Sequence, residues 1–231
     1  MRASAFRDGL AAALPIMAGY VVLGLPCGLL CQQAGLSWVM VLLMSMLFYS
    51  GAGQYMIPNM LLAANPLASI VLSVALVNSR QMLYGASLSR FCETVNRPLA
   101  FLFGATVTDE SFGVNLARFA NGGWDVRRAT FVNLCSQLAW IVSTVVGNLV
   151  GSLVSFPTAI ASFAMTSIFI CLLCMQKVNA VNVIAALAAI AGVIVCKCVG
   201  LAGPAILVGA LFGCLCGYLF GSLQLKRGER A

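Results

Sequence analysis

The chain has 231 residues, of which 61% are hydrophobic and only 8% are charged, and its formal net charge is +7. A soluble domain carries about 25% charged residues, so this composition cannot supply a polar surface and excludes a soluble fold. The basic residues stand mostly at the ends of apolar segments, where they orient membrane helices, so the positive charge does not indicate a nucleic-acid partner. We therefore expect a bilayer to surround most of the chain.

Apolar runs bounded by charged residues, Pro or Gly follow one another along the chain. They cover residues 11–31, 37–64, 67–89, 99–118, 129–155, 158–176, 180–199 and 203–223. A spanning helix takes about 20 residues, so the runs predict an all-α, polytopic membrane helix bundle with about eight transmembrane segments. We expect residues 1–231 to form a single transmembrane domain, which would accommodate an inverted repeat although the sequence shows no internal similarity.

The basic residues predict the orientation of this bundle. With a cytoplasmic N-terminus and eight crossings, the residues on the inside are Arg2, Arg7, Arg118, Arg127, Arg128, Lys177, Lys226, Arg227 and Arg230, and those on the outside are Arg90, Arg97 and Lys197. The positive-inside rule then predicts that both termini are cytoplasmic. The uncharged turn at Asn65-Pro66 leaves open whether the second and third segments are full crossings or include a re-entrant pair.

Helix-breaking residues interrupt the first two segments: Gly24, Pro26 and Gly28 in the first, and Ser50-Gly51-Ala52-Gly53-Gln54 in the second. A backbone group freed in hydrocarbon costs several kcal/mol, so such breaks persist where protein or a watery cavity satisfies them, as at the substrate sites of transporters. We therefore expect two broken helices, with a hinge at Gly24, Pro26 and Gly28 and substrate-binding groups at Gly51, Gly53 and Gln54. A proline kink that improves packing explains the first interruption equally well.

Two ladders of small residues mark close helix packing. Gly209, Gly213, Gly217 and Gly221 form one, and Ser143, Gly147, Gly151 and Ser155 form the other. Small residues four apart let membrane helices approach closely, either within this chain or against a partner subunit.

Three ionisable residues lie deep in apolar segments, namely Arg80, Asp109 and Glu110. Each costs about 2.5 to 3.5 kcal/mol at a helix centre, which implies pairing, function or both. An Arg fork suits a substrate carboxylate, so we expect Arg80 to bind one, with Asn78 and Tyr84 beside it. Asp109 and Glu110 would bind an amine or couple protons. The alternative is an ion pair of Arg80 with one acid that only fixes helix register.

A polar stripe runs along the fifth segment, at Asn133, Gln137, Trp140, Thr144 and Asn148. Two readings of this stripe are equally good: the side chains line a cavity, or they bond neighbouring helices together.

The residues needed for several kinds of chemistry are missing or poorly placed. The chain has no His, and nearly all of its 10 Cys stand in apolar runs, so we expect no metal site and no cofactor. No nucleotide-binding glycine loop is present, and without His a Ser nucleophile has no His base. We therefore expect a secondary transporter and not an enzyme.

Four stretches in order resemble the AzlC family, the large subunits of two-component branched-chain amino acid exporters. They are Gly19-Tyr20-Val21 through Gly24 and Gly28, Phe48-Tyr49-Ser50-Gly51-Ala52-Gly53-Gln54, Asn78-Ser79-Arg80-Gln81-Met82-Leu83-Tyr84-Gly85-Ala86-Ser87, and Thr108-Asp109-Glu110-Ser111-Phe112. The family usually has a His where this chain has Gln81, which shifts proton handling towards Asp109 and Glu110 or changes the substrate.

This resemblance implies a proton-driven exporter of valine, leucine, isoleucine or methionine in the cytoplasmic membrane. It also implies a small hydrophobic AzlD-like membrane subunit as the partner. A structural membrane subunit that transports nothing, or a channel-like pore, remains the alternative to this reading.

Overall fold

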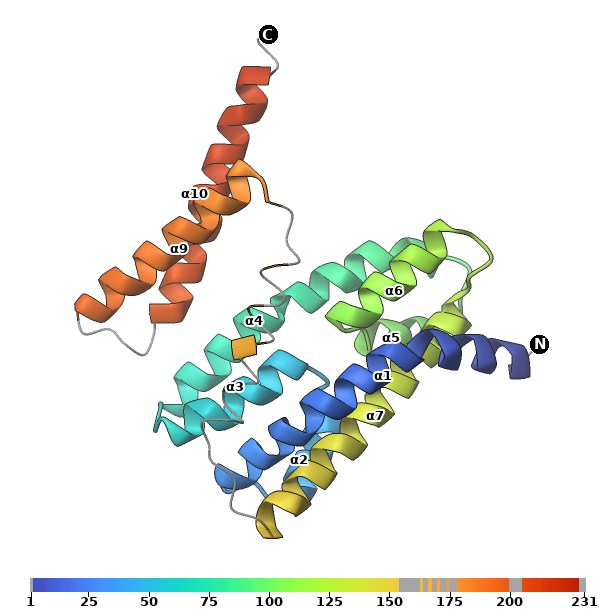
Figure 1. The fold of residues 1–231 in the computed structure, drawn as a ribbon. Coiled ribbons are helices and arrows are strands. Elements are labelled where there is room, and N and C mark those ends of the chain that lie inside the picture. Colours follow the sequence, from blue (N-terminus) through green and yellow to red (C-terminus); the bar gives the residue numbers. More distant parts are fainter. Residues whose placement is uncertain are drawn as a thin grey trace. The chain divides into compact units, whose positions relative to one another are not determined.

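The computed structural model describes residues 2–153, 178–199 and 205–228, together with a few single positions between 163 and 174. Residues 1–64 and 77–168 form one compact unit, unit 1, and residues 65–76 and 169–231 form a second, unit 2. Within the described ranges the elements are helices: α1 Arg2–Gln33, α2 Trp38–Leu47, α3 Gly51–Leu62, α4 Leu67–Leu88, η1 Ser89–Phe91, α5 Arg97–Ala105, α6 Asp109–Ala120, α7 Val126–Leu153, α9 Ala180–Cys198 and α10 Ala205–Gly228 (Figure 1). The predicted segment 158–176, Ser155, Lys177 and Arg230 fall outside the described residues, apart from single positions of that segment.

Four helices of the described chain are long and apolar enough to cross a membrane. They cover Ser4–Gln33, Leu67–Phe91, Val126–Leu153 and Ala180–Cys198. The prediction of a multi-pass, all-helical membrane protein is thereby confirmed in these residues. Two of the expected eight crossings differ, because segments 37–64 and 99–118 each consist of two short helices.

The core of unit 1 is the contact between α1 and α7, which run in the same direction. Gly24 lies against Ser143, Gly28 against Thr144 and Asn148. A Cβ atom at Gly28 would overlap the Thr144 carbonyl oxygen. Small residues on both helices therefore bring the two backbones together.

The break predicted at Gly24, Pro26 and Gly28 is wrong, because α1 continues as one helix from Arg2 to Gln33 with both Pro15 and Pro26 inside it. The glycines serve the close approach of α7, and a helix in a membrane tolerates an internal proline when its neighbours satisfy the freed backbone.

The break predicted in the second segment is confirmed, and it makes a hairpin. α2 has 10 residues and α3 has 12, so neither can cross a bilayer core of about 30 Å at 1.5 Å per residue. α2 runs back along α7, with the Leu36 carbonyl at Asn148 and Ser45 at Thr144. After the break at Tyr49 and Ser50, α3 turns back in the direction of α1 (Figure 1).

A second hairpin replaces the crossing expected over 99–118. α5 has 9 residues and α6 has 12, and Thr106–Thr108 separate them. Asn133 of α7 bonds both the Phe103 carbonyl and Asn115, so α5 and α6 pass the same level of α7 in opposite directions. The reversal arises because Thr108 caps a new helix: its hydroxyl accepts from the Ser111 amide, and the Ser111 hydroxyl accepts from the Thr108 amide.

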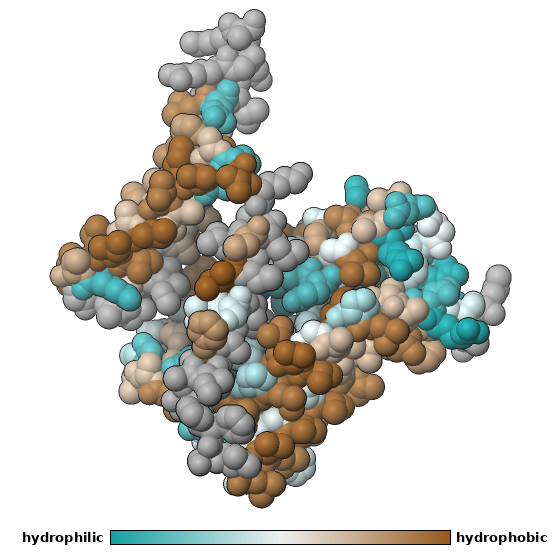
Figure 2. Space-filling model, in the orientation of Figure 1, coloured by the Kyte–Doolittle hydropathy of each residue, from teal (hydrophilic) through white to brown (hydrophobic). Residues whose placement is uncertain are grey.

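The two hairpins gather the arginines of unit 1, apart from Arg80, at one end, which we call the basic end. The Phe91 ring stacks on Phe119 with centroids 4.0 Å apart, which brings the end of α4 to the end of α6. Arg128 of α7 pairs with Asp8 of α1 at 2.9 Å. Figure 2 shows hydrophilic residues gathered at this end, beside the N-terminus.

The prediction that Arg90 and Arg97 lie on the opposite side from the N-terminus is therefore wrong. Both belong to the basic end, because the α2–α3 hairpin does not cross, so that the second half of α4 runs back to the end at which α1 begins. The arginines of this end are Arg2, Arg7, Arg90, Arg97, Arg118, Arg127 and Arg128. Lys197 lies in unit 2, and its side stays a prediction.

In unit 1 a long helix is twice followed by a short hairpin, and whether the two halves form an inverted repeat stays a prediction. α1 runs away from the basic end and is followed by a hairpin that enters from the far side. The second half of α4 runs towards the basic end and is followed by a hairpin that enters from there. The two hairpin tips, residues 48–50 and 106–108, both reach the middle of α1 at Tyr20.

Unit 2 contains the antiparallel pair α9 and α10. The ladder Gly209, Gly213 and Gly217 packs against Ala185, Ala189 and Val193 of α9. Of the two uses predicted for this ladder, packing within the chain is the one that the structure shows.

Replacing Gly28 by Ala should destabilise unit 1, because the added methyl would overlap the α7 backbone. We expect a loss of about 1 to 3 kcal/mol in the free energy of unfolding, measured by denaturant titration in detergent micelles. Gly19→Ala is the matched control, since no atom lies within 4 Å of its Cβ position on the same helix. Equal stability of the two variants would contradict the packing described here.

Epitope tags should reveal the hairpin topology. A tag inserted after Thr94 and one inserted after Gly122 should be accessible from the same side of the membrane, and a tag after Gly35 from the other, measured with antibody on intact and opened spheroplasts. Eight full crossings would instead place the tags at 94 and 122 on opposite sides.

Candidate functional site

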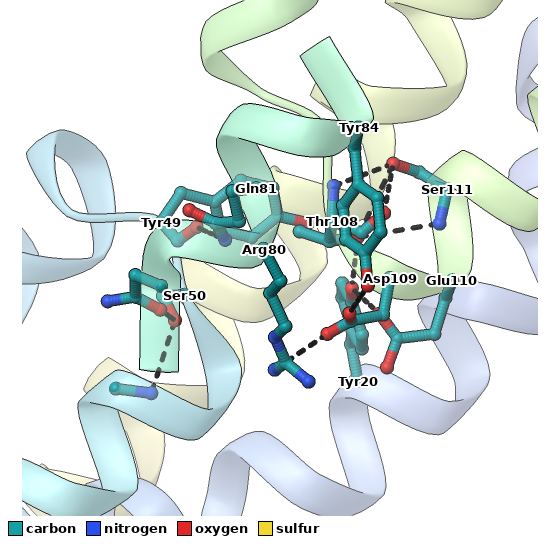
Figure 3. Close-up of polar contacts among 12 residues, drawn as sticks. Tyr20, Tyr49, Ser50, Arg80, Gln81, Tyr84, Thr108, Asp109, Glu110 and Ser111 are labelled. Carbon is teal, nitrogen blue, oxygen red and sulfur yellow. Dashed lines mark hydrogen bonds and ion pairs between the residues drawn. The ribbon is translucent and has the colours of Figure 1, made fainter. Parts of the chain in front are cut away.

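Four residues of α4 face the two hairpin tips: Asn78, Arg80, Gln81 and Tyr84 (Figure 3). The Arg80 guanidinium pairs with Asp109 at 2.9 Å. The Tyr84 hydroxyl donates to the other carboxylate oxygen of Asp109 at 2.5 Å. The predicted approach of Arg80 to an acid of the neighbouring segment is thus present, and Asp109 is the acid.

The two acids lie in the first turn of α6. Asp109 and Glu110 follow the cap residue Thr108, where the positive end of the helix dipole favours negative charge. The Glu110 carboxylate accepts a hydrogen bond of 2.6 Å from Tyr20 of α1, and the same Tyr20 oxygen lies 2.7 Å from the Thr108 hydroxyl. The two carboxylates therefore have different partners: Asp109 has the Arg80 guanidinium and the Tyr84 phenol, and Glu110 has the Tyr20 phenol.

The tip of the first hairpin contacts α4 next to Arg80. Ser50 caps α3 by accepting from the Gly53 amide at 3.1 Å, and its hydroxyl donates to Asn78. Gln81 donates to the Tyr49 carbonyl at 3.3 Å. A Cβ atom at Gly53 would lie 2.7 Å from the Phe48 ring and 3.0 Å from the Asn78 amide nitrogen, so only glycine leaves room for this contact.

Two buried nitrogen atoms in this cluster have no hydrogen-bond partner among the described residues. They are the Asn78 amide nitrogen and the Arg80 Nε atom. The side chains of Arg80 and Asp109 are 27% and 21% exposed, so the ion pair is only partly covered. The cluster therefore offers unused N–H groups beside a guanidinium, which is a setting suited to a carboxylate.

Gln54 lies apart from this cluster and is fully buried. Its carbonyl oxygen accepts from Ser45 and from the Trp140 indole at 3.0 Å each, and its amide nitrogen donates to the Phe48 carbonyl at 2.6 Å. Gly51 packs on the same indole: a Cβ atom added at Gly51 would lie 3.6 Å from the Trp140 ring. These contacts close the α2–α3 hairpin, so a role of Gln54 or Gly51 in binding substrate stays a prediction.

The polar stripe of α7 bonds helices together. Asn133 donates to the Phe103 carbonyl at 3.1 Å, Gln137 to the Met46 carbonyl at 3.1 Å and Asn148 to the Leu36 carbonyl at 3.0 Å. Each of these carbonyls lies near a helix end, in a hairpin or turn, where intrahelical bonding is incomplete. Of the two readings left open by the sequence, interhelical bonding is the one that these contacts favour.

The structure thus brings together most of the predicted site residues: Asn78, Arg80, Tyr84, Asp109, Glu110 and, at the edge, Gly53. It does not bring Gly24, Pro26 or Gly28 to them, and Gly24 and Gly28 instead pack α1 on α7. Sequence reasoning missed Tyr20, Ser50 and Thr108 as site residues. Ser50 and Thr108 carry a readable signal, since each precedes a helix as its cap.

Comparisons with known proteins agree on one family. The AzlC protein family matches residues 15–154, which contain both hairpins and the whole cluster. The branched-chain amino acid transport protein AzlC of Bacillus subtilis is 32% identical over 173 residues, which cover 72% of this chain and 66% of that protein.

Two further relatives extend the match. The inner membrane protein YgaZ of Escherichia coli is 30% identical over 95% of this chain and 90% of its own length. An uncharacterized membrane protein of Helicobacter pylori is 37% identical over 73% of this chain and 74% of its own length. No solved structure matches the chain. The family match over more than half of the sequence shows that this chain belongs to the AzlC family.

Proposed function

We propose that the chain is the large subunit of a secondary exporter of branched-chain and related apolar amino acids, namely valine, leucine, isoleucine and methionine. The observation that carries this proposal is the partly exposed Arg80–Asp109 pair between the tips of two hairpins. Membership of the AzlC family and the printed name of the Bacillus relative support the substrate class.

In this proposal the substrate carboxylate binds Arg80. The unused Arg80 Nε atom and Asn78 amide nitrogen supply further donors. A bound carboxylate competes with Asp109 for the guanidinium, and Asp109 is then free to take the substrate amine or a proton. When all three groups are charged, Arg80, Asp109 and Glu110 together carry a net charge of −1. In this proposal one acid is therefore paired with an external cation or is protonated.

Glu110 is the second coupling group in this proposal. Its described partner is the neutral Tyr20 hydroxyl, so no cation of the described residues holds it in the charged form. A proton taken up by Glu110 would be exchanged for substrate as access alternates between the two sides.

We further propose that the exporter lies in the cytoplasmic membrane with both termini cytoplasmic and works with a small hydrophobic AzlD-like subunit. The gathering of seven arginines at the end of unit 1 that holds the N-terminus supports a cytoplasmic N-terminus. The E. coli relative is named an inner membrane protein, which supports the choice of membrane.

The Arg80→Lys variant should lose amino acid efflux while inserting normally, because Lys keeps the charge and loses the fork that holds a carboxylate. We expect efflux of valine from preloaded cells to fall by about tenfold or more, in line with one or two lost hydrogen bonds to a charged group. Arg90→Gln, at the basic end and away from the cluster, is the control and should leave efflux unchanged. If Arg80→Lys transports normally, Arg80 holds helices and does not bind the carboxylate.

The Glu110→Gln variant should separate coupling from binding. We expect it to lose uncoupler-sensitive net efflux and to keep exchange of labelled for unlabelled valine, because Arg80 and Asn78 are unchanged. Glu93→Gln, outside the cluster in the turn before α5, is the matched control. Loss of exchange together with net efflux would assign Glu110 to substrate binding, and full retention of both would remove it from the mechanism.

A further inference from the structure

A groove of about 800 Å³ opens at the basic end of unit 1, between α1, α5 and α7. Its mouth contains Asn96, Asp125, Arg127 and Arg128, and its deeper wall contains Leu99, Leu102, Phe131 and Leu134. The groove is separate from the Arg80 cluster, so the inference drawn from it does not depend on the proposed transport function.

The lining changes from polar to apolar with depth. Leu134 stands seven residues beyond Arg127 on α7, which is about 10 Å along the helix axis. Leu99 and Leu102 form the α5 wall along the same stretch, and Leu102 is 40% exposed. The groove is polar at the end of α7 and apolar one to two helical turns deeper. This order matches a lipid of one leaflet, whose polar headgroup lies above its acyl chains.

Both carboxylates at the mouth pair with the same guanidinium. Arg128 is held by Asp8 at 2.9 Å and by Asp125 at 3.5 Å. Arg127 is exposed and has no ion pair among the described residues. These two arginines and two aspartates carry no net charge together, but within the described chain Arg127 stands as an unpaired guanidinium above an apolar wall, and its best complement is an anion attached to a hydrocarbon chain.

We propose that this groove binds one anionic phospholipid of the leaflet at the basic end, with its phosphate at Arg127 and an acyl chain along Leu99, Leu102 and Leu134. A zwitterionic lipid carries its own cation beside the phosphate and gains less from Arg127. The lipid would fill the space between α5 and α7, and so support the hairpin that carries Asp109 and Glu110.

The test measures lipid retained by the purified full-length chain. Native mass spectrometry after exchange into micelles with dioleoyl phosphatidylglycerol or dioleoyl phosphatidylcholine should show one tightly retained phosphatidylglycerol. Arg127→Gln should weaken its binding by about fivefold, whereas Arg90→Gln, which lies at the same end outside the groove, should change it by less than twofold. Equal retention of the two lipids, or an equal loss in both variants, would overturn the proposal.

A photo-crosslinking amino acid at position 102 tests for a protein occupant in cells. Lipid adducts that disappear in Arg127→Gln support the proposal. Adducts to another membrane protein or to a second copy of the chain, without lipid adducts, would make the groove a protein interface and overturn it.

Discussion

Backbone carbonyls near the ends of the short helices need partners inside a bilayer, and α7 supplies several of them. Its amide side chains donate to carbonyls at the end of α5, at the end of α2 and in the turn after α1. In hydrocarbon no water replaces a lost bond, so each of these contacts helps to satisfy a carbonyl near a helix end. The spacing of polar residues along one helix face therefore sets how deeply each hairpin enters, and with it where the two tips meet.

The meeting of the tips makes it possible to keep charged groups at this depth. Asp109 and Glu110 stand at the start of α6, where free amides and the helix dipole offset negative charge. Arg80, Tyr84 and Tyr20 then reach the carboxylates from α4 and α1. Within a continuous crossing helix the same residues would have no free amides and no helix N-terminus beside them. The charged cluster therefore depends on the second hairpin.

How much the sequence predicts depends on the kind of signal. The break at Ser50 is readable because a cap residue and two glycines interrupt an apolar run. The break at Thr106–Thr108 was not predicted, because Thr and Val do not stand out from a hydrophobic segment. Thr108 followed by two acids is nevertheless a signature of a helix start. Arg80 and Asp109 are predictable because midspan charges are rare, whereas Tyr20 meets Glu110 across 90 residues of sequence. Gly24 and Gly28 led to the wrong prediction of a broken helix, since glycine is common both at hinges and at close contacts between helices.

The two hairpins are fastened by different chemistry, and this bears on the proposed transport cycle. The α2–α3 hairpin is closed by the buried Gln54, Ser45 and Trp140, whose hydrogen bonds do not depend on pH in the range where carboxylates titrate. The tip that begins α6 is tied to α4 and α1 through Asp109 and Glu110, whose bonds change with protonation or with a competing substrate carboxylate. A proton or a substrate would thus act first on the α5–α6 hairpin, which enters from the basic end, while the opposite hairpin keeps its place.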